Sequence, residues 1–259
     1  MKNSLITIIT ITYNAGKFLE KTILSVLNQT NKNFEYILVD GNSKDNTLDI
    51  IKQYESYIGE GRFGDFPAAQ YRWISEPDKG LYDAMNKGMK MAKGEFLWFI
   101  NAGDKIYNEN TIGEIYKRMD EEDGFDVIYG QSLMIDEKDI PLGERHKIAP
   151  KVLTKRSLLN GLVVCHQSII VRKNIAPDYD LQYKISADYD WTVKVLEKSR
   201  DNLYINNYIS KFMIAGLSAQ QRKKSWIERY RIMKKHFGIC PTLWAHFVII
   251  LKYPFTRKY

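Results

Sequence analysis

The sequence of 259 residues has little that would mark a secreted, disulfide-stabilised or membrane-spanning protein. Its only cysteines, Cys165 and Cys240, do not form a C-x-x-C pair, so we expect no disulfide framework and a reducing cytoplasm as the location. No apolar run reaches the roughly 18 residues of a membrane-spanning helix. The apolar run after Ser4 ends at Tyr13 without a small-residue cleavage site, so we interpret it as a buried strand and not as a signal peptide.

Glycine-rich phosphate-binding signatures are also absent. A dinucleotide-binding enzyme needs Gly-x-Gly-x-x-Gly after its first strand, whereas this chain has Tyr-Asn-Ala-Gly-Lys at residues 13–17. The P-loop pattern Gly-x-x-x-x-Gly-Lys-Ser/Thr is missing, and so is the Gly-rich, Arg-containing loop of sugar-nucleotide pyrophosphorylases. We find no internal repeat and no nucleic-acid-binding motif, so nucleic acid is not an expected partner.

The first hundred residues do contain a regular alternation of strand-like and helix-like segments. Strands are expected at Leu5–Thr12, Phe34–Val39, Tyr71–Ile74 and Phe96–Ile100. Helices are expected at Lys17–Leu27, Asn46–Tyr57 and Leu81–Ala92. This order is typical of an α/β fold with a Rossmann-like, mostly parallel sheet flanked by helices. After Tyr107 the alternation is less clear, with a strand expected at Ser168–Val171 and a helix at Asp188–Leu196.

Each expected strand is followed directly by polar residues. These are Thr12-Tyr13-Asn14, Asp40-Gly41-Asn42-Ser43, Ser75-Glu76-Pro77-Asp78 and Asn101-Ala102-Gly103-Asp104. Parallel α/β sheets bind ligands beyond the carboxyl ends of their strands, so the four segments together predict a binding site at one edge of the sheet. Taken singly, each segment also consists of ordinary turn and helix-capping residues.

Particular side chains in these segments indicate particular chemistry. The Asp40 carboxylate can accept hydrogen bonds from a base or a ribose. Asp83 and Asn86 are three residues apart, so they share one helix face, and Lys79 just before them can meet a phosphate. Asp104 can hold Mg²⁺ or Mn²⁺ against a diphosphate, because these cations prefer oxygen ligands and share them with phosphates.

An acidic pair, Asp188 and Asp190, precedes the last clear helical pattern of the body of the chain. Transfer of a sugar to a hydroxyl needs a base that takes the hydroxyl proton. Two carboxylates at this spacing point to different sides of a helix start, so one can do chemistry while the other caps the helix. Helix capping is the alternative interpretation of the motif.

Taken together, these segments resemble family 2 glycosyltransferases. The likeness rests on Thr10–Asn14, Leu38–Ser43, Asp78–Gly88 and Gly94–Asp104, and on their order and spacing. It is strong over residues 4–107, moderate at 165–172 and 186–196, and faint beyond 217. The resemblance implies a GT-A fold and an inverting transfer from a nucleotide-diphosphate sugar, often a UDP-sugar. The acceptor it implies is a hydroxyl of a saccharide or of a polyprenyl-diphosphate-linked saccharide, in bacterial surface-polysaccharide biosynthesis.

The resemblance also divides the chain and assigns residues to roles. It implies a nucleotide-sugar half over 1–107, an acceptor-binding and catalytic half over 108–217, and a basic helical extension over 218–259. The base of the reaction falls on Asp188, with Ala187 where the family usually has an acidic neighbour, and the divalent cation falls on Asp104. The residues implied to bind the nucleotide are Thr12, Tyr13, Asn14, Asp40, Asn42, Asp78, Lys79, Gly80, Asp83 and Asn86.

The chain departs from the family at the metal motif. That motif is typically Asp-x-Asp, whereas here the two positions hold Asn101 and Gly103, and only the next residue is acidic; a subset of the family has this Asn-Ala-Gly-Asp form. A His-Gln pair of the same subset matches His166 and Gln167, which places them near the acceptor or the diphosphate; a structurally satisfied histidine is the alternative. The rival function is a non-catalytic nucleotide-sugar-binding protein, against which the retained Asp188 speaks.

Most of the net charge of +7 lies near the C-terminus. Arg222–Tyr259 contains ten Lys/Arg and one acid, Glu228, which leaves about nine positive charges there. Apolar residues form one helical stripe: Leu243, Phe247 and Leu251. Such a segment predicts peripheral contact with the inner face of the cytoplasmic membrane. The alternatives are packing on the chain's own core or on a second subunit in a homodimer, and a role for Arg222 in a loop that closes over the donor.

Overall fold

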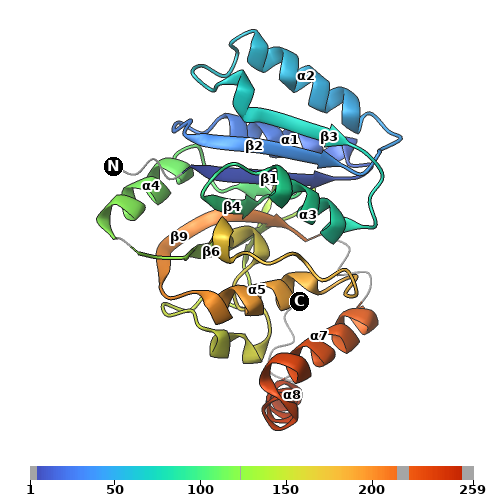
Figure 1. Cartoon of the computed structure of the whole chain (residues 1–259), viewed down its shortest axis with the longest axis vertical. Helices are drawn as coiled ribbons and strands as arrows, with labels where there is room; N and C mark the ends of the chain where they lie inside the picture. The colour runs from blue at the N-terminus through green and yellow to red at the C-terminus, as the bar shows by residue number, and fades with distance from the viewer. Residues whose placement is uncertain (1–4, 123, 215–221, 253–259) are drawn as a thin grey trace.

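A single twisted sheet with helices on both faces runs through the computed structural model, which describes residues 5–122, 124–214 and 222–252 (Figure 1). The strands are β1 (Ile6–Thr12), β2 (Phe34–Asp40), β3 (Tyr71–Ser75), β4 (Phe96–Phe99), β5 (Lys105–Ile106), β6 (Val127–Ile135), β7 (Pro141–Glu144), β8 (Ile169–Arg172) and β9 (Asn202–Met213). The α-helices are α1 (Gly16–Leu27), α2 (Thr47–Gly59), α3 (Leu81–Met91), α4 (Thr111–Glu121), α5 (Ala187–Lys198), α7 (Arg222–Phe237) and α8 (Ile239–Lys252). Short 3-10 helices are η1 (Ala68–Gln70), η2 (Lys155–Asn160), η3 (His166–Ser168) and η4 (Lys173–Ile175).

The strand order is β3-β2-β1-β4-β8-β6-β9-β5, with β7 beside β6. The first four strands of this order are parallel, as the sequence predicts. The second half is mixed, because β8 runs antiparallel to both β4 and β6 while β6 and β9 are parallel. β6 and β7 are joined by a turn of a few residues, and so short a connection requires an antiparallel pair. The polar carboxyl ends of β1, β2 and β3 therefore lie at one edge of the sheet.

The sheet is buried on both faces by two separate apolar cores. Ile6 and Ile8 pack with α1, α2 and α4, whereas Ile9 and Ile11 pack with α3, α5 and α7. This division follows from the strand period of two, which sends neighbouring side chains to opposite faces. Burial on both faces explains why β1 is a continuous apolar and β-branched run, since none of its seven residues is exposed.

The C-terminal helices α7 and α8 lie at the lower end of the molecule in Figure 1, away from α2. Part of each packs on the body of the chain, since Ile232 and Met233 of α7 and Ala245 of α8 are buried in the same core as α5. The predicted helical stripe of the tail therefore lies on a real helix, α8. Within the described ranges, no helix is long and apolar enough to cross a membrane.

Candidate active site

The loops that follow β1 and β2 are locked together by side-chain hydrogen bonds. The Ser43 hydroxyl accepts from the backbone N–H of Asn14 at 2.8 Å, and the Asn14 side chain accepts from the N–H of Lys44 at the same distance. The Thr47 hydroxyl, at the start of α2, accepts from the Ala15 N–H at 2.9 Å. Asn14 has a φ of 47°, in the left-handed region that asparagine tolerates better than most residues. The two strand ends thus form one frame.

Asp40 fixes the end of β2 to the end of β3. Its side chain is fully buried, and it accepts hydrogen bonds from the Ser43 N–H at 3.1 Å, from the Ser43 hydroxyl, and from the Ser75 hydroxyl at 2.6 Å. These bonds make Asp40 part of the floor of the site. Its predicted contact with a base or ribose stays a prediction.

Tyr13, Gly41 and Asp78 meet where the three loops converge. A Cβ atom on Gly41 would lie 2.4 Å from Asp78 Oδ2 and 3.3 Å from the Tyr13 ring, so only glycine allows this approach. The Tyr13 side chain is 64% exposed although it is large and apolar. An open aromatic ring beside a carboxylate, beyond the strand ends, provides a face for a planar base and an acceptor for its N–H groups.

The start of α3 is built by the two carboxylates that flank it. Asp78 accepts from Gly80 N–H at 2.7 Å, and Asp83 accepts from Lys79 N–H at 2.9 Å. Gly80 has φ 113°, a conformation that a side chain would strain. Asp83 and Asn86 have different partners. Asp83 binds the backbone of the loop before α3, whereas Asn86 binds a distant loop.

Asn86 holds a distant loop against α3. Its amide N–H₂ donates to the carbonyl of Tyr179 at 3.0 Å, and its amide oxygen accepts from the Tyr179 N–H at 2.7 Å. The side chain is buried, and both of its polar atoms have a backbone partner. The structure therefore gives Asn86 a positioning task, and its predicted contact with the nucleotide stays a prediction.

Asp104 lies buried at the junction of the two halves of the sheet. Oδ2 accepts from the Gln167 amide at 2.7 Å, and Oδ1 accepts from the Met213 N–H at 2.9 Å. Burial raises the pKa of Asp104 to about 7, and these two hydrogen bonds offset only part of the rise. Sequence reasoning named both Asp104 and Gln167, and the structure brings them into direct contact.

Two oxygens near the ends of β1 and β4 are buried without a hydrogen-bond partner, Thr12 Oγ1 and Asn101 Oδ1. The two residues are neighbours across the sheet, since Ala102 N–H donates to Ile11 O at 3.2 Å. Unpaired buried oxygens are costly, and a bound group that supplies a donor or a cation removes the cost. No trio of His, Cys, Asp or Glu in the described ranges could hold a metal alone. The site fits a cation that takes one or two protein oxygens and completes its shell with phosphate oxygens and water.

Asp188 and Asp190 have different surroundings at the start of α5. Asp190 is fully buried and contacts Lys194 at 2.5 Å and His236 at 2.8 Å. Burial by itself would raise the pKa of Asp190, but the hydrogen bonds from His236 and Lys194 outweigh burial and lower it to about 2. Asp188 is half-buried and faces α3, where its Oδ1 lies 3.2 Å from the Tyr82 hydroxyl. Neither carboxylate caps the helix.

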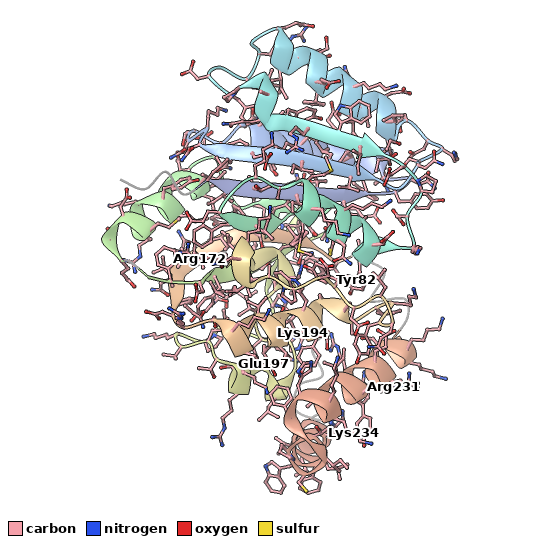
Figure 2. All side chains as sticks on the ribbon, in the orientation of Figure 1. Tyr82, Arg172, Lys194, Glu197, Arg231 and Lys234 are labelled. Carbon is pink, nitrogen blue, oxygen red and sulfur yellow. The ribbon has the colours of Figure 1, made fainter. Side chains whose placement is uncertain are left out.

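Tyr82, labelled in Figure 2, connects the α3 loop with Asp188 and was not among the predicted site residues. Its hydroxyl also lies 2.8 Å from the carbonyl of Ile185. Burial, followed by the charge of Asp188, holds the pKa of Tyr82 well above its usual value, so this hydroxyl stays a donor. The signal in the sequence is that Tyr82 lies within residues 78–88, next to Asp83, which was predicted to bind the nucleotide.

His166 belongs to an aromatic cluster beneath Asp188. Its Nε2 lies 2.7 Å from the Tyr179 hydroxyl, and Tyr179 stacks on Trp191 with ring centroids 5.0 Å apart. Burial lowers the pKa of His166, although the charge of Asp188 opposes this, so a neutral ring is favoured. This geometry matches the satisfied histidine of the alternative interpretation.

Three cations, Arg145, Lys147 and Arg229, lie close together near α5. Burial, followed by the charges of Arg229 and Arg145, lowers the pKa of Lys147 to about 8. Arg229 Nε is buried without a hydrogen-bond partner, and the Arg229 charge reaches Tyr189, next to Asp188. Such a group of cations favours an anion. Arg222 is the first residue of α7, and its side chain lies outside the described residues.

Glu228, the only acid of the basic tail, holds the segment before Asp188. Its carboxylate accepts from three consecutive backbone N–H groups, those of Lys184, Ile185 and Ser186, each at 2.9 Å. Ser186 also lies 3.2 Å from Ser225 through its hydroxyl. The sequence gives no signal for this contact, because the partners are about forty residues apart.

Comparison with known sequences yields one family. The model of glycosyl transferase family 2 matches residues 7–179. A PGL/p-HBAD biosynthesis glycosyltransferase of Mycobacterium tuberculosis is 32% identical over 200 residues, which cover 75% of this chain and 70% of that protein. The putative teichuronic acid biosynthesis glycosyltransferase TuaG of Bacillus subtilis is 27% identical over 239 residues, 90% of each chain.

Solved structures share the fold at low sequence identity. Residues 1–349 of S. aureus TarS in complex with UDP give a TM-score of 0.70 at 19% identity, over 98% of this chain and 75% of that one. The mannosyltransferase PcManGT from Pyrobaculum calidifontis in complex with GDP-Man and Mn²⁺ gives a TM-score of 0.66 at 13% identity, over 96% of this chain and 71% of that one. At these identities the likeness shows the GT-A fold alone.

Proposed function

The chain belongs to glycosyl transferase family 2 and is a glycosyltransferase, and we propose that it moves a sugar from a nucleotide-diphosphate donor, most simply a UDP-sugar, with inversion at the anomeric carbon. One observation carries the proposal. Asp188 lies half-buried at the start of α5, facing Tyr82 of α3, where the polar ends of the parallel strands also converge. This position supports Asp188 as a base close to the strand ends that would hold the donor nucleotide.

The donor nucleotide occupies the frame formed by the loops after β1, β2 and β3. The exposed ring of Tyr13 stacks on the base, and the carboxylate of Asp78 accepts from it. Asn14 and Asn42, both in the left-handed region, set the path of the loops around the ribose. Lys79, just before α3, reaches toward the phosphates. The relatives with bound UDP or GDP-Man support this class of donor.

The reaction is a single displacement. Asp188 takes the proton of the acceptor hydroxyl, the oxygen forms a bond to the anomeric carbon, and the bond from that carbon to the diphosphate oxygen breaks. The Tyr82 hydroxyl donates toward Asp188 in the free enzyme and fixes the orientation of its carboxylate. The nucleoside diphosphate leaves with the bonding electrons, opposite to the incoming oxygen.

Asn101 and Asp104 are the residues that would hold a divalent cation, Mn²⁺ or Mg²⁺. When bound, the cation neutralises charge that develops on the leaving diphosphate. Asn101 offers an amide oxygen without a partner, and Asp104 offers carboxylate oxygens that each use a single hydrogen bond. Gln167 orients Asp104 from the second half of the sheet.

The acceptor approaches from the side of α5 and α7. The cations Arg145, Lys147 and Arg229 favour an acceptor that carries phosphate, such as a polyprenyl-diphosphate-linked saccharide, at the inner face of the cytoplasmic membrane. The named relatives in teichuronic acid and PGL biosynthesis support a role in bacterial surface-polysaccharide or glycolipid assembly. If the acceptor carries no phosphate, these three cations have another role.

The test is a donor screen. Purified protein is incubated with UDP-, GDP- and dTDP-sugars, a polyprenyl-diphosphate saccharide mixture and Mn²⁺, and released nucleotide is measured. We expect one donor to give acceptor-dependent release. Tight donor binding with no release from any combination would instead favour the non-catalytic nucleotide-sugar-binding function.

A further inference from the structure

Helix α8 turns a continuous apolar face outward. Five large apolar side chains lie on one arc of the helix and are 52–68% exposed. They are Ile239, Leu243, Trp244, Phe247 and Leu251. No charged residue lies between Ile239 and Leu251, and the opposite side of the helix packs on the body through Thr242 and Ala245. We call these five residues the α8 apolar face. Exposed apolar surface of this extent on one helix marks a contact surface.

The neighbouring helix α7 exposes a different mixture. Trp226, Ile227 and Tyr230 are exposed, and they share their arc of the helix with exposed cations. Those cations are Lys223, Arg231 and Lys234, of which the last two are labelled in Figure 2. Aromatic rings interleaved with Lys and Arg are typical of helices that lie at the boundary between headgroups and acyl chains.

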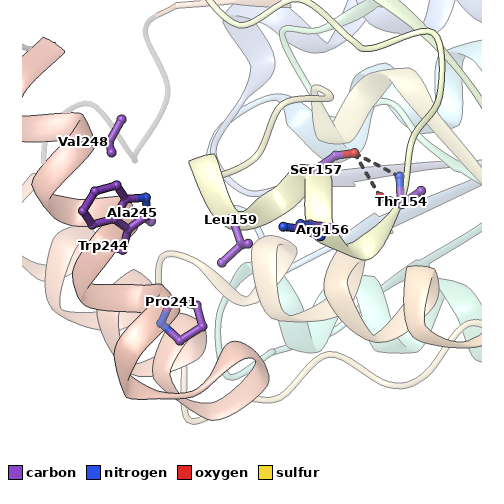
Figure 3. Close-up of a pocket in the computed structure, with 8 residues that line it drawn as sticks. All are labelled: Thr154, Arg156, Ser157, Leu159, Pro241, Trp244, Ala245 and Val248. Carbon is purple, nitrogen blue, oxygen red and sulfur yellow. Dashed lines mark hydrogen bonds between the residues drawn. The ribbon is translucent and has the colours of Figure 1, made fainter.

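A groove of about 630 Å³ separates α8 from η2 (Figure 3). Apolar side chains line most of it, namely Leu159, Pro241, Trp244, Ala245 and Val248. Exposed Arg156 contributes a cation to the lining. Because Trp244 belongs both to the groove and to the α8 apolar face, the two surfaces are continuous. An apolar slot with a guanidinium suits an acyl chain with a phosphate headgroup.

We propose that α7 and α8 form a docking surface for an anionic phospholipid bilayer. The α8 apolar face enters the headgroup region, and Lys223, Arg231 and Lys234 of α7 contact the negative headgroups. A second copy of the chain is the competing occupant. A two-fold interface through these helices would place the cations of α7 opposite the same cations of the partner, and such a pairing is repulsive. The bilayer supplies the opposite charge.

The test is flotation of the full-length protein with vesicles, without donor or acceptor, so its outcome does not depend on the proposed transfer reaction. Vesicles of phosphatidylcholine alone are compared with vesicles that contain phosphatidylglycerol. We expect binding to the phosphatidylglycerol vesicles that weakens as salt is raised. Trp244→Ser with Phe247→Ser should lower the partition coefficient by roughly tenfold or more. Arg231→Glu with Lys234→Glu should lower it by at least about tenfold.

Matched controls lie elsewhere on the surface. Lys52→Glu reverses an exposed charge on α2, and Ile140→Ser removes an apolar side chain that is 54% exposed in the turn before β7. Both controls should float like the wild type. Absence of binding at low salt overturns the proposal, and so does binding that ignores the anionic lipid. A dimer in light scattering that Trp244→Ser converts to a monomer would assign the face to a second copy instead.

Discussion

Asp188 and Asp190 are two residues apart on α5, yet only one of them is free to act as a base. Asp190 is surrounded by Lys194, Lys235 and His236, and the two lysine charges together with the hydrogen bond to His236 keep it ionised inside the protein. Asp188 faces α3, and its carboxylate accepts a hydrogen bond from the Tyr82 hydroxyl. A base has to change its protonation state during the reaction, and the ion pairs of Asp190 oppose that change.

Asp188→Asn should therefore lower kcat by roughly 10²- to 10⁴-fold, because a positioned base contributes about that much. The Asn side chain is nearly isosteric, so the dissociation constant for the donor should stay close to that of the wild type. Steady-state nucleotide release and calorimetric donor titration measure the two quantities. Asp120→Asn, an exposed change on α4, is the control, and near-wild-type turnover of Asp188→Asn would remove Asp188 from this role.

Chelation should abolish most turnover, and Mn²⁺ or Mg²⁺ should restore it, if Asn101 and Asp104 hold a cation against the diphosphate. Asp104→Asn should need a higher cation concentration for half-maximal rate, because it removes the only carboxylate of the motif. Nucleotide release is titrated against Mn²⁺ for both proteins. Full activity in chelator would mean that cations such as Lys79 perform this neutralisation instead.

At the scale of elements, side chains of α7 bind both α5 and the segment just before it. Glu228 binds the backbone just before α5, and His236 binds Asp190 inside it. Helix α7 thus supports the start of α5, in addition to its place in the proposed docking surface. Loss of either contact should disturb the start of α5, where Asp188 is located.

Asp190→Asn should lower the free energy of unfolding at pH 7 by about 2 kcal/mol, which corresponds to the fall in the pKa of Asp190 from 3.8 to about 2. A carboxyl group whose pKa is lower in the folded state than in the unfolded state stabilises the fold. This stability is fully present above the pKa of the unfolded state and is lost as the pH falls through the pKa of the folded state. The difference between wild type and variant should therefore shrink from pH 4 toward pH 2. Urea denaturation of both proteins across this range measures it. A difference that does not depend on pH would contradict the ion-pair explanation.

Glu228→Gln should reduce kcat several-fold while KM for the donor changes little, since the nucleotide frame lies on other loops. The amide keeps one accepting oxygen, but its NH₂ group replaces the other and faces a backbone N–H, so at least one of the three hydrogen bonds is lost together with the charge. Lys224→Gln, an exposed change on the same helix, is the control. A several-fold rise in the KM for the donor with unchanged kcat would show that Glu228 acts on donor binding and not on α5.

The sequence predicts local structure well and long-range contacts poorly. The strands of the first hundred residues emerge because burial on both faces leaves continuous apolar runs, and the polar residues that end them mark the site. The Tyr82–Asp188 pair spans 106 residues and the Asn86–Tyr179 pair spans 93. No local pattern encodes such pairings. The hydrogen bonds between Asn86 and the backbone of Tyr179 were therefore not predicted.

The second half of the sheet was predicted least well for a related reason. The strand expected at Ser168–Val171 is present as β8, but β5, β6, β7 and β9 were not predicted. A strand as short as β5 carries little periodicity, and the direction of each of these strands is set by the strands beside it. His166 also shows this limit, since only the fold reveals that its neighbours are Tyr179 and Trp191.

At the scale of the molecule, one sheet joins the nucleotide frame to the catalytic helix. The strands β1 to β4 present the donor loops, β8 and η3 deliver Gln167 to Asp104, and β9 ends at Met213 beside the same carboxylate. Under the proposed function, Asp104 belongs to the donor side of the site and Asp188 to the acceptor side. In the proposed function Asp188 is the one base beside the sugar, and one base is what a single displacement with inversion requires.

The anomeric configuration of the product tests this central claim most directly. Once the donor is known, the product is isolated early in the reaction and its anomeric proton coupling is measured by NMR, beside that of the donor sugar. A single displacement assisted by Asp188 predicts the opposite configuration in the product, and no product with Asp188→Asn. A product that keeps the configuration of the donor would contradict the account.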